Sequence, residues 1–256
     1  MKELSVAERR QEILGRVSQA GRVAVAELSQ EFGVSEVTIR GDLQALAEGN
    51  LIVRTHGGAI PATSGLPVLT LSQRLQQQVQ QKAHIGAAAA RLVAEGDAVI
   101  LDSSSTAFAI AQNLKAHRYV TVITNGLAVA QELLDAPGVT VVVIGGTVRK
   151  DTASIVSTGG LDMLRRFNIQ KGFFGAHGIS LAEGLTDVSA EEAEIKRPLV
   201  AMCREVVAVF DATKWGRVGL ASFADVSQIA RIITDIYAPA ELVTRIRQAG
   251  VDVIQV

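Results

Sequence analysis

The sequence has little cysteine, no long apolar run and almost no net charge. A single cysteine, Cys203, excludes an internal disulfide framework and a cysteine-rich zinc site. The four histidines, at positions 56, 84, 117 and 177, do not have the spacing of metal ligands. No apolar stretch approaches the roughly 18 residues that a membrane-spanning helix needs, and the first four residues carry an acid rather than an apolar signal region. We therefore expect a cytoplasmic protein with no metal and no membrane partner.

The charge balance also lacks a global sign of nucleic-acid binding, with 25 Lys and Arg against 26 Asp and Glu. A small DNA-reading unit needs basic residues on one face only, so this balance does not exclude such a unit. No Gly-x-Gly-x-x-Gly follows the first predicted strand of the larger region, which argues against a dinucleotide, and we expect no cofactor. Hydrophobic residues make up 48% of the 256 residues, which is enough for a sizeable core.

Three regions follow one another along the chain. Residues 1–60 have the pattern of three short helices and a glycine-containing hairpin. Residues 61–69 contain two of the five prolines and are predicted to be a linker. Residues 70–256 alternate between apolar strands and helices. The sequence therefore predicts an α/β protein, with an N-terminal winged helix-turn-helix domain and a larger, mostly parallel α/β domain.

The third helix of the first region is predicted to be the recognition helix. Polar side chains on its first turns would meet the major groove, whereas Val37 and Ile39 are expected to pack against the other helices. The residues expected to contact DNA there are Ser35, Thr38 and Arg40. An arginine can pair with guanine or hold a phosphate. Ser35 also fits a purely structural role as the N-cap of this helix.

The hairpin after this helix is predicted to be the wing. Arg54 and His56 lie on it, where a phosphate or minor-groove contact is expected. His56 precedes two glycines and fits equally well as a solvated turn residue.

These motifs resemble a known family. Arg9-x3-Ile13-x3-Val17, followed after seventeen residues by Ser35-x2-Thr38-Ile39-Arg40-Gly41-Asp42-Leu43, is similar to the signature of the DeoR family of bacterial sugar-metabolism regulators. Residues 53–59 resemble the wing of that family. The resemblance implies that Asp42 is a structural acid paired with an arginine. Gly41 stands where a second basic residue is commoner, which implies a weaker phosphate grip.

The larger region contains seven apolar runs that are predicted to be strands. The runs cover residues 98–101, 120–123, 139–144, 172–174, 206–210, 229–233 and 251–254. Continuous apolar strands separated by helices predict a parallel sheet that is covered on both faces. Before the first strand, helical spacing predicts one helix from Thr70 to about residue 94.

Polar and glycine-rich loops follow five of these strands. The loops are Asp102-Ser103-Ser104-Ser105-Thr106, Thr124-Asn125-Gly126, Gly145-Gly146-Thr147, Gly175-Ala176-His177-Gly178 and Asp211-Ala212-Thr213-Lys214. In open α/β sheets ligands bind beyond the carboxyl ends of the strands, so the loops are expected to meet at one cleft. Asp102 and Asp211 can accept hydrogen bonds from sugar hydroxyls, Lys214 adds positive charge, and residues 103–106 precede a helix whose N-terminus suits a phosphate. We therefore expect a sugar or sugar phosphate.

The resemblance to the DeoR family continues through this region, and it implies a fold similar to ribose-phosphate isomerase and the CoA transferases. It implies effector contacts by Asp102, Ser103, Ser104, Ser105, Thr106, Thr124, Asn125, Lys171, Glu192, Lys196 and Lys214. Two residues depart from the family pattern: Ser104 replaces a glycine, and His177 replaces an aspartate. Without the resemblance, Glu192 and Lys196 also fit a surface ion pair, and His177 fits either a ligand contact or an ordinary loop histidine.

Together these patterns predict a repressor of carbohydrate-utilisation genes that binds double-stranded operator DNA and is controlled by its sugar ligand. A small reading head favours a homo-oligomer, either a dimer or a tetramer. Two alternatives remain open: a sugar-phosphate isomerase-like enzyme that carries a DNA-binding head, or a C-terminal domain that only mediates assembly or binds another protein. Because His177 stands where the isomerase-like motif has an acid, we expect binding without turnover and no enzyme activity.

Overall fold

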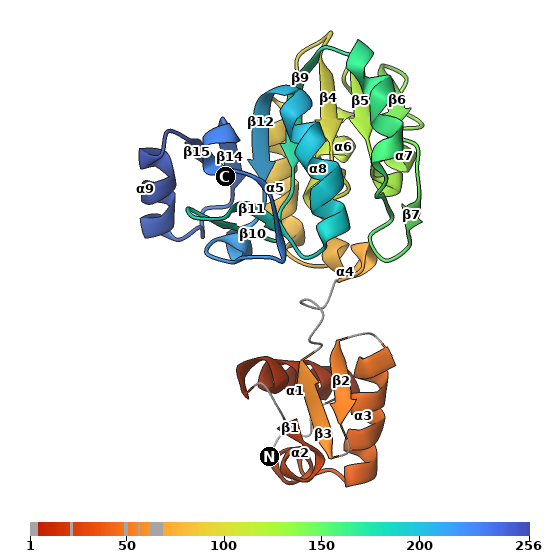
Figure 1. Ribbon diagram of the computed structural model, residues 1–256, viewed down its shortest axis with the longest axis vertical. Helices are drawn as coiled ribbons and strands as arrows, with labels where there is room; N and C mark the ends of the chain where they lie inside the picture. The colour runs from red at the N-terminus through yellow and green to blue at the C-terminus, as the bar shows by residue number, and fades with distance from the viewer. Residues whose placement is uncertain (1–4, 21–22, 49–50, 56, 62–68) are drawn as a thin grey trace. The chain divides into compact units, whose positions relative to one another are not determined.

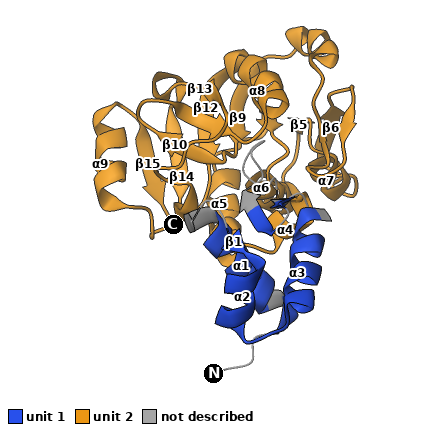
Figure 2. Cartoon of the chain, turned by 60° about the horizontal axis from the view of Figure 1, so that its bottom comes forward, with its two compact units in different colours: residues 1–68 blue, residues 69–256 orange. Residues whose placement is uncertain are grey.

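A computed structural model describes residues 5–20, 23–48, 51–55, 57–61 and 69–256 (Figure 1). The chain forms two compact units, residues 1–68 and 69–256 (Figure 2). His56 and residues 62–68 of the predicted linker lie outside the described residues, and Pro61 is the last residue of a strand. None of the described helices combines the length and apolar character needed to cross a membrane.

The N-terminal unit is a winged helix-turn-helix. Its elements are α1 (Val6–Ala20), β1 (Val23–Ala24), α2 (Val25–Phe32), α3 (Glu36–Glu48), β2 (Ile52–Thr55) and β3 (Gly58–Pro61). β2 and β3 form the hairpin of the wing, and β1 pairs with the other side of β3. Gly33 ends α2 with a φ of 65°, so it supplies the left-handed turn between α2 and α3. Ile13, Leu28 and Ile39, from the three helices, are buried in one core.

The second unit is built on a seven-stranded parallel sheet in the order β15-β14-β12-β9-β4-β5-β6. Its strands are β4 (Ala98–Leu101), β5 (Val120–Thr124), β6 (Val139–Val143), β9 (Ile169–Phe174), β12 (Cys203–Val209), β14 (Arg231–Thr234) and β15 (Asp252–Gln255). All seven predicted strands are confirmed, and every pair between them is parallel.

Helices cover both faces of this sheet. They are α4 (Leu71–Leu75), α5 (Val79–Ala90), α6 (Ser105–Leu114), α7 (Leu127–Glu132), α8 (Ala190–Met202) and α9 (Ala240–Gln248), with 3-10 helices η1 (Thr158–Arg166), η2 (Ala212–Lys214) and η3 (Val226–Gln228). Val99 and Leu101 pack with α5 and α6 on one face, whereas Ile100 packs with α8 on the other. Figure 2 shows α5 and α6 on the side of the sheet opposite α8.

Short antiparallel strands, which the sequence pattern did not predict, flank the large sheet. β7 (Val148–Arg149) and β8 (Ser154–Ile155) form a hairpin after β6. β10 (Gly178–Ser180), β11 (Gly184–Asp187) and β13 (Ala221–Ala224) form a three-stranded sheet. These strands have two to four residues, too few for an alternating pattern to be recognised.

The prediction of one helix from Thr70 to about residue 94 is wrong, because the helix is broken between α4 and α5. Thr70 begins α4 with a capping box to Gln73. Gln78 then adopts a left-handed φ of 50°. The buried ammonium of Lys82 donates to the carbonyl oxygens of Arg74 and Gln77, at 2.5 and 2.7 Å. A lysine thus satisfies carbonyl groups that a continuous helix would pair with backbone N–H groups.

Candidate functional site

The recognition helix α3 has one solvent-exposed stripe. Its exposed members are Glu36, Val37, Arg40, Gly41 and Gln44, which recur at helical spacing. The opposite side of α3 carries buried residues of the head core, including Ile39 and Leu43. This stripe is the surface that α3 can present to a DNA groove.

Ser35 caps α3, as one of its two predicted roles requires. Its Oγ accepts a hydrogen bond from the backbone N–H of Thr38 at 3.1 Å and lies 2.9 Å from the Thr38 hydroxyl. Thr38 is half-buried. The two hydroxyls therefore stabilise the start of the helix, and a DNA contact from either stays a prediction.

Arg40 and Arg54 are exposed, each beside a polar neighbour. Arg40 forms an ion pair with Glu36, one turn earlier, at 2.6 Å. Arg54 on β2 donates to the side chain of Gln44. An exposed ion pair contributes little to stability, so Arg40 can leave Glu36 for a base or a phosphate at small cost.

Val37 does not pack against the other helices, and that prediction is wrong. The side chain is 75% exposed. It lies on the same stripe as Arg40, whereas Ile39 is fully buried. Val37 and Ile39 are two positions apart in the helix. Each position turns the side chain by about 100° around the helix axis, so the two side chains point to opposite sides.

Asp42 links α3 to α1 through two ion pairs. Its two carboxylate oxygens pair with Arg9 at 2.6 Å and Arg10 at 2.8 Å, both on α1. Asp42 and Arg9 are buried. The structural role that the family resemblance implies for Asp42 is therefore present, because the acid links the recognition helix to α1.

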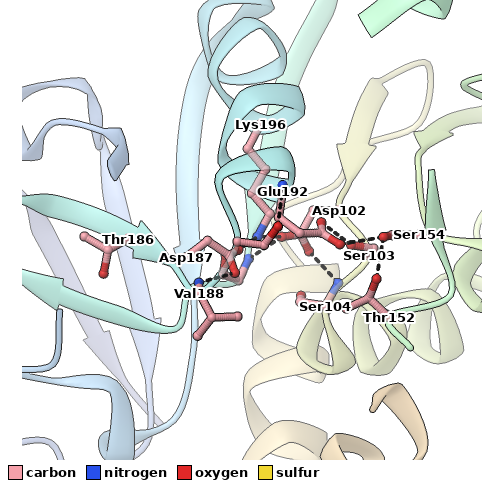
Figure 3. Close-up of polar contacts among 12 residues, drawn as sticks. Asp102, Ser103, Ser104, Thr152, Ser154, Thr186, Asp187, Val188, Glu192 and Lys196 are labelled. Carbon is pink, nitrogen blue, oxygen red and sulfur yellow. Dashed lines mark hydrogen bonds and ion pairs between the residues drawn. The ribbon is translucent and has the colours of Figure 1, made fainter. Parts of the chain in front are cut away.

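In the second unit, a buried polar network lies at the carboxyl edge of the sheet (Figure 3). At its centre the ammonium of Lys196 contacts Asp102 at 3.0 Å, Asp187 at 2.8 Å and the carbonyl oxygen of Gly175 at 2.9 Å. Burial alone would lower the pKa of Lys196, but Asp102, Asp187 and Glu192 outweigh it and raise that pKa. Lys196 therefore stays charged, and the alternative of a surface ion pair with Glu192 is wrong.

Glu192 links this network to the β7–β8 hairpin. Its carboxylate accepts a hydrogen bond from Ser154 at 2.5 Å and a longer one from Ser103 at 3.5 Å. The hydroxyl of Thr152 lies 2.7 Å from that of Ser154. The backbone of the same hairpin pairs with Asn125, whose N–H₂ group donates to the Ile155 carbonyl at 3.2 Å. The side-chain oxygen of Asn125 is buried without a partner among the described residues.

The serine-rich loop after β4 turns directly into α6. Asp102 accepts hydrogen bonds from the backbone N–H groups of Ser104 at 3.0 Å and Gly175 at 2.9 Å. The Ser104 hydroxyl caps α6 by accepting from the N–H of Ala107 at 3.0 Å. A side chain at Gly175 would collide with Ser104, so this glycine allows the two loops to touch. Residues 102–106, Thr124 and Asn125 are all buried.

A cluster of cations adjoins the network. Lys82 and Lys214 interact electrostatically with Arg74 and with the buried Asp211. Arg217 belongs to the same group through Lys214. The Nε and Nη2 atoms of Arg74 are buried, and among the residues that the structure describes they have no hydrogen-bond partner. We refer to Arg74, Lys82, Lys214 and Arg217 as the cation cluster.

Burial, and to a lesser extent the neighbouring positive charges, lower the pKa values of the two lysines of the cation cluster and of His177. The pKa of Lys82 is lowered to about 8, mainly by burial, which Asp211 opposes and to which Lys214 and Arg74 add. Burial also lowers the pKa of Lys214, with Asp211 opposing and Arg217 and Arg74 adding to the effect. The pKa of His177 is lowered by burial and by Lys214, which favours the neutral imidazole. A bound anion would relieve this repulsion.

The structure does not bring every predicted residue to this place. Lys171 lies at the opposite, amino edge of the sheet, where it pairs with Asp97 at 2.8 Å. It occupies the third position of β9, opposite the second residue of β4, which places it near the start of both strands. Gly145 and Gly146 are exposed and lie against Gly160 and Ser157.

Several residues of the site carried no usable signal in the sequence. Arg74, Lys82 and Asp187 were not predicted, nor were Thr152 and Ser154. Arg74 and Lys82 precede the first strand of the sheet, and only the break between α4 and α5 brings them to its carboxyl edge. Asp187 ends the four-residue strand Gly184–Asp187, which is too short to be recognised from its pattern. Within the described ranges, no three His, Cys, Asp or Glu side chains are grouped so that they could hold a metal ion.

The winged helix-turn-helix, joined to an α/β unit with a buried polar site, defines a transcription regulator with a DNA-binding head and a sensing domain. Comparison with known families agrees: a DeoR-like helix-turn-helix domain matches residues 9–64, and a DeoR C terminal sensor domain matches residues 77–236. The chain belongs to the DeoR family of transcription regulators.

Whole-chain relatives have the same organisation. The chain is 35% identical to the HTH-type transcriptional regulator GolR of Listeria innocua, over 96% of this chain and 97% of that protein. It is 34% identical to the HTH-type transcriptional repressor GlcR of Bacillus subtilis, over 89% and 88%. It is 31% identical to the glycerol-3-phosphate regulon repressor of Escherichia coli, over 92% and 93%.

Similarity to solved structures is lower. Ribose 5-phosphate isomerase A of Methanocaldococcus jannaschii aligns with a TM-score of 0.42 at 15% identity, over 54% of this chain and 55% of that one. This likeness is too weak to bear on function or on the predicted isomerase-type fold.

Proposed function

We propose that this DeoR-family regulator is a repressor of carbohydrate-utilisation genes, and that a phosphorylated sugar bound at the carboxyl edge of the large sheet controls its affinity for operator DNA. The observation that carries the proposal is at Arg74, where two buried guanidinium nitrogens, Nε and Nη2, lack a hydrogen-bond partner within the described residues. Buried donors are costly unless they are paired. A phosphate accepts from an arginine through two oxygens at once and would pair both nitrogens.

The carboxylate network supplies groups for the rest of such a ligand. Asp187 joins the two parts, because it pairs with Lys196 and also interacts electrostatically with Arg74 and Lys214. The unpartnered oxygen of Asn125 is a hydrogen-bond acceptor. A ligand that is anionic at one end and rich in hydroxyl groups at the other fits this arrangement.

The names of the relatives point the same way. One is the glycerol-3-phosphate regulon repressor, which is named for a phosphorylated polyol, and GlcR is also named as a repressor. Both names describe repressors, and we extend that role to this chain. From the name of the glycerol-3-phosphate regulon repressor we also take the class of ligand, a phosphorylated polyol.

Binding without turnover is part of the proposal. An aldose–ketose isomerase needs a general base that is positioned to take a proton from carbon. Both oxygens of Asp102 accept backbone N–H groups, and both oxygens of Glu192 accept serine hydroxyls. Asp211 accepts from the N–H of Thr213 at 3.0 Å. The candidate bases are therefore engaged in holding loops, and the isomerase alternative has no favouring observation.

Control of DNA binding requires that the ligand prefer one arrangement of the protein. We propose a cytoplasmic homo-oligomer, a dimer or tetramer, in which two heads bind repeated half-sites. The ligand would lower operator affinity by shifting the population toward an arrangement in which both heads cannot bind together.

The test is a ligand titration with a matched pair of arginine variants. Thermal unfolding is followed with a panel of phosphorylated sugars, the unphosphorylated sugars and inorganic phosphate. A true ligand at 100 times its Kd should stabilise the sensing domain by about 2.7 kcal/mol. Arg74→Gln should weaken the binding of phosphorylated sugars by about tenfold or more, because it removes a charged hydrogen-bond partner. Arg91→Gln, at an exposed arginine that ends α5, should bind as the parent does.

Three results would contradict the proposal. If no sugar or sugar phosphate stabilised the protein, the α/β unit would serve assembly. If Arg74→Gln and Arg91→Gln bound equally, Arg74 would lie outside the site. If the purified chain interconverted aldose and ketose phosphates, the protein would be an enzyme with a DNA-binding head.

A further inference from the structure

We propose that Val37 reads a thymine of the operator by packing against its C5-methyl group in the major groove. Val37 would thus be a specificity-determining residue of the DNA-binding unit. This inference concerns DNA readout alone, so it stands or falls independently of the sugar ligand.

The first observation is the exposure of Val37. The side chain is 75% exposed on the first turn of α3, whereas the head buries Val17, Val23 and Val25 in its core. One exposed apolar residue is ordinary on a protein surface. Its position is not ordinary, because the first turns of a recognition helix are the part that approaches base edges.

The neighbours of Val37 favour base edges over phosphates. Glu36 precedes it on the same stripe, and Arg40 follows one turn later, paired with Glu36 at 2.6 Å. A carboxylate would be repelled by a phosphate, but it can accept from the amino group of cytosine. Arg40 can donate to guanine. The apolar Val37 lies beside this ion pair on the stripe, and among the base edges of the major groove only thymine presents a methyl group.

The second observation is Gly41, one turn beyond Val37 on the same stripe. A glycine inside a helix costs about 1 kcal/mol relative to alanine. Nothing within the head requires it, since a Cβ at this position would meet no atom within 4 Å. At Gly41, beside Val37, the outward-facing surface of the helix therefore carries no side chain. A base edge can approach Val37 there without meeting another side chain.

The experiment removes single methyl groups from the DNA. The full-length chain first selects its binding sequence from a random duplex library. Each thymine of the selected site is then replaced by uracil, which lacks only the C5-methyl group, and the affinities are compared at fixed salt. Because one buried methyl group contributes about 0.8 kcal/mol, we expect one thymine per half-site at which uracil binds about fourfold more weakly.

The variants assign that effect to a residue. Val37→Ala should bind thymine and uracil equally at that position, with a Kd for the thymine site close to that of the parent for uracil. Val6→Ala removes the same methyl groups from an exposed valine of α1 and should keep the fourfold preference. Thermal unfolding of Val37→Ala should match the parent, because the residue makes no core contact.

Two outcomes would overturn the proposal. In one, no thymine of the selected site shows a methyl effect, or no sequence is selected. In the other, a methyl effect is found but Val37→Ala retains it, which would assign the thymine contact to another residue of the stripe.

Discussion

Two buried lysines of the sensing domain have opposite pKa shifts, although both have lost solvent. Lys196 lies among Asp102, Asp187 and Glu192, and their charge raises its pKa despite burial. Burial lowers the pKa of Lys82 to about 8, because Asp211 opposes it only in part and Lys214 and Arg74 add to it. The first lysine is already neutralised by the protein. A bound anion would stabilise the charged form of the second lysine, Lys82.

This difference predicts a pH dependence of ligand binding. A bound phosphate favours the charged form of Lys82, which in the free protein loses its proton as the pH rises through about 8. Affinity for the phosphorylated ligand should therefore be highest below pH 8 and fall above it, approaching tenfold for each pH unit. Calorimetry in buffers of different ionisation enthalpy should show proton uptake on binding near pH 8.

The control for this prediction is Lys82→Arg, whose side chain stays charged over the whole range. Its affinity should change little between about pH 7 and pH 9. An affinity of the parent chain that is independent of pH in this range would mean that Lys82 does not contact the anion.

At the scale of elements, the crossing of α5 and α6 positions both parts of the site. α5 carries Lys82, and α6 begins at the serine-rich loop after β4. Gly86 lets the helices approach, because a Cβ there would lie 2.7 Å from the backbone of Ala109. Gly15 of α1 is also inside a helix, but a Cβ there would meet nothing within 4 Å. Close helix packing therefore requires a glycine at position 86, whereas no neighbouring atom requires one at position 15.

Alanine at these two positions should have opposite effects on the free energy of unfolding. Gly86→Ala should destabilise the sensing domain by about 1–3 kcal/mol through overpacking, and it should weaken ligand binding by displacing α5 from α6. Gly15→Ala should stabilise the head by about 0.5–1 kcal/mol through helix propensity. Urea unfolding measures both. A stable Gly86→Ala variant with unchanged ligand affinity would show that the crossing tolerates a shift.

For the whole molecule, each unit has its own hydrophobic core. The head is built around Ile13, Leu28 and Ile39, and the α/β unit has cores on both faces of its sheet. Units with separate cores can unfold separately. The proposed sugar site lies within the second unit, and the recognition helix lies within the first.

We therefore expect two unfolding transitions in calorimetry. The phosphorylated ligand should raise the Tm of the sensing domain alone, and operator DNA should raise that of the head, since each ligand stabilises the unit that binds it. A single cooperative transition, shifted as a whole by either ligand, would mean that the two units share an interface that holds them together.

The sequence by itself determined the winged helix-turn-helix, the seven strands of the sheet and the polar loops at its carboxyl edge. Helical and strand periodicity, caps and turn residues are encoded over a few neighbouring positions, so they can be read without the fold. Ser35 caps its helix as its local sequence predicts, and the cap at Thr70 and the turn at Gly33 likewise involve only residues near in sequence.

Only the tertiary structure decided which side chains meet. Lys171 lies at the amino edge of the sheet, away from the polar network, because it is near the start of β9. Its position along the strand, and not its charge, decides at which edge it lies. Val37 faces outward because it is two positions from the buried Ile39, which places it on the opposite side of the helix. Arg74 and Lys82 lie on either side of a break between α4 and α5, which the uninterrupted apolar spacing of that segment did not reveal. Such placements depend on contacts between residues far apart in the chain, to which local patterns are blind.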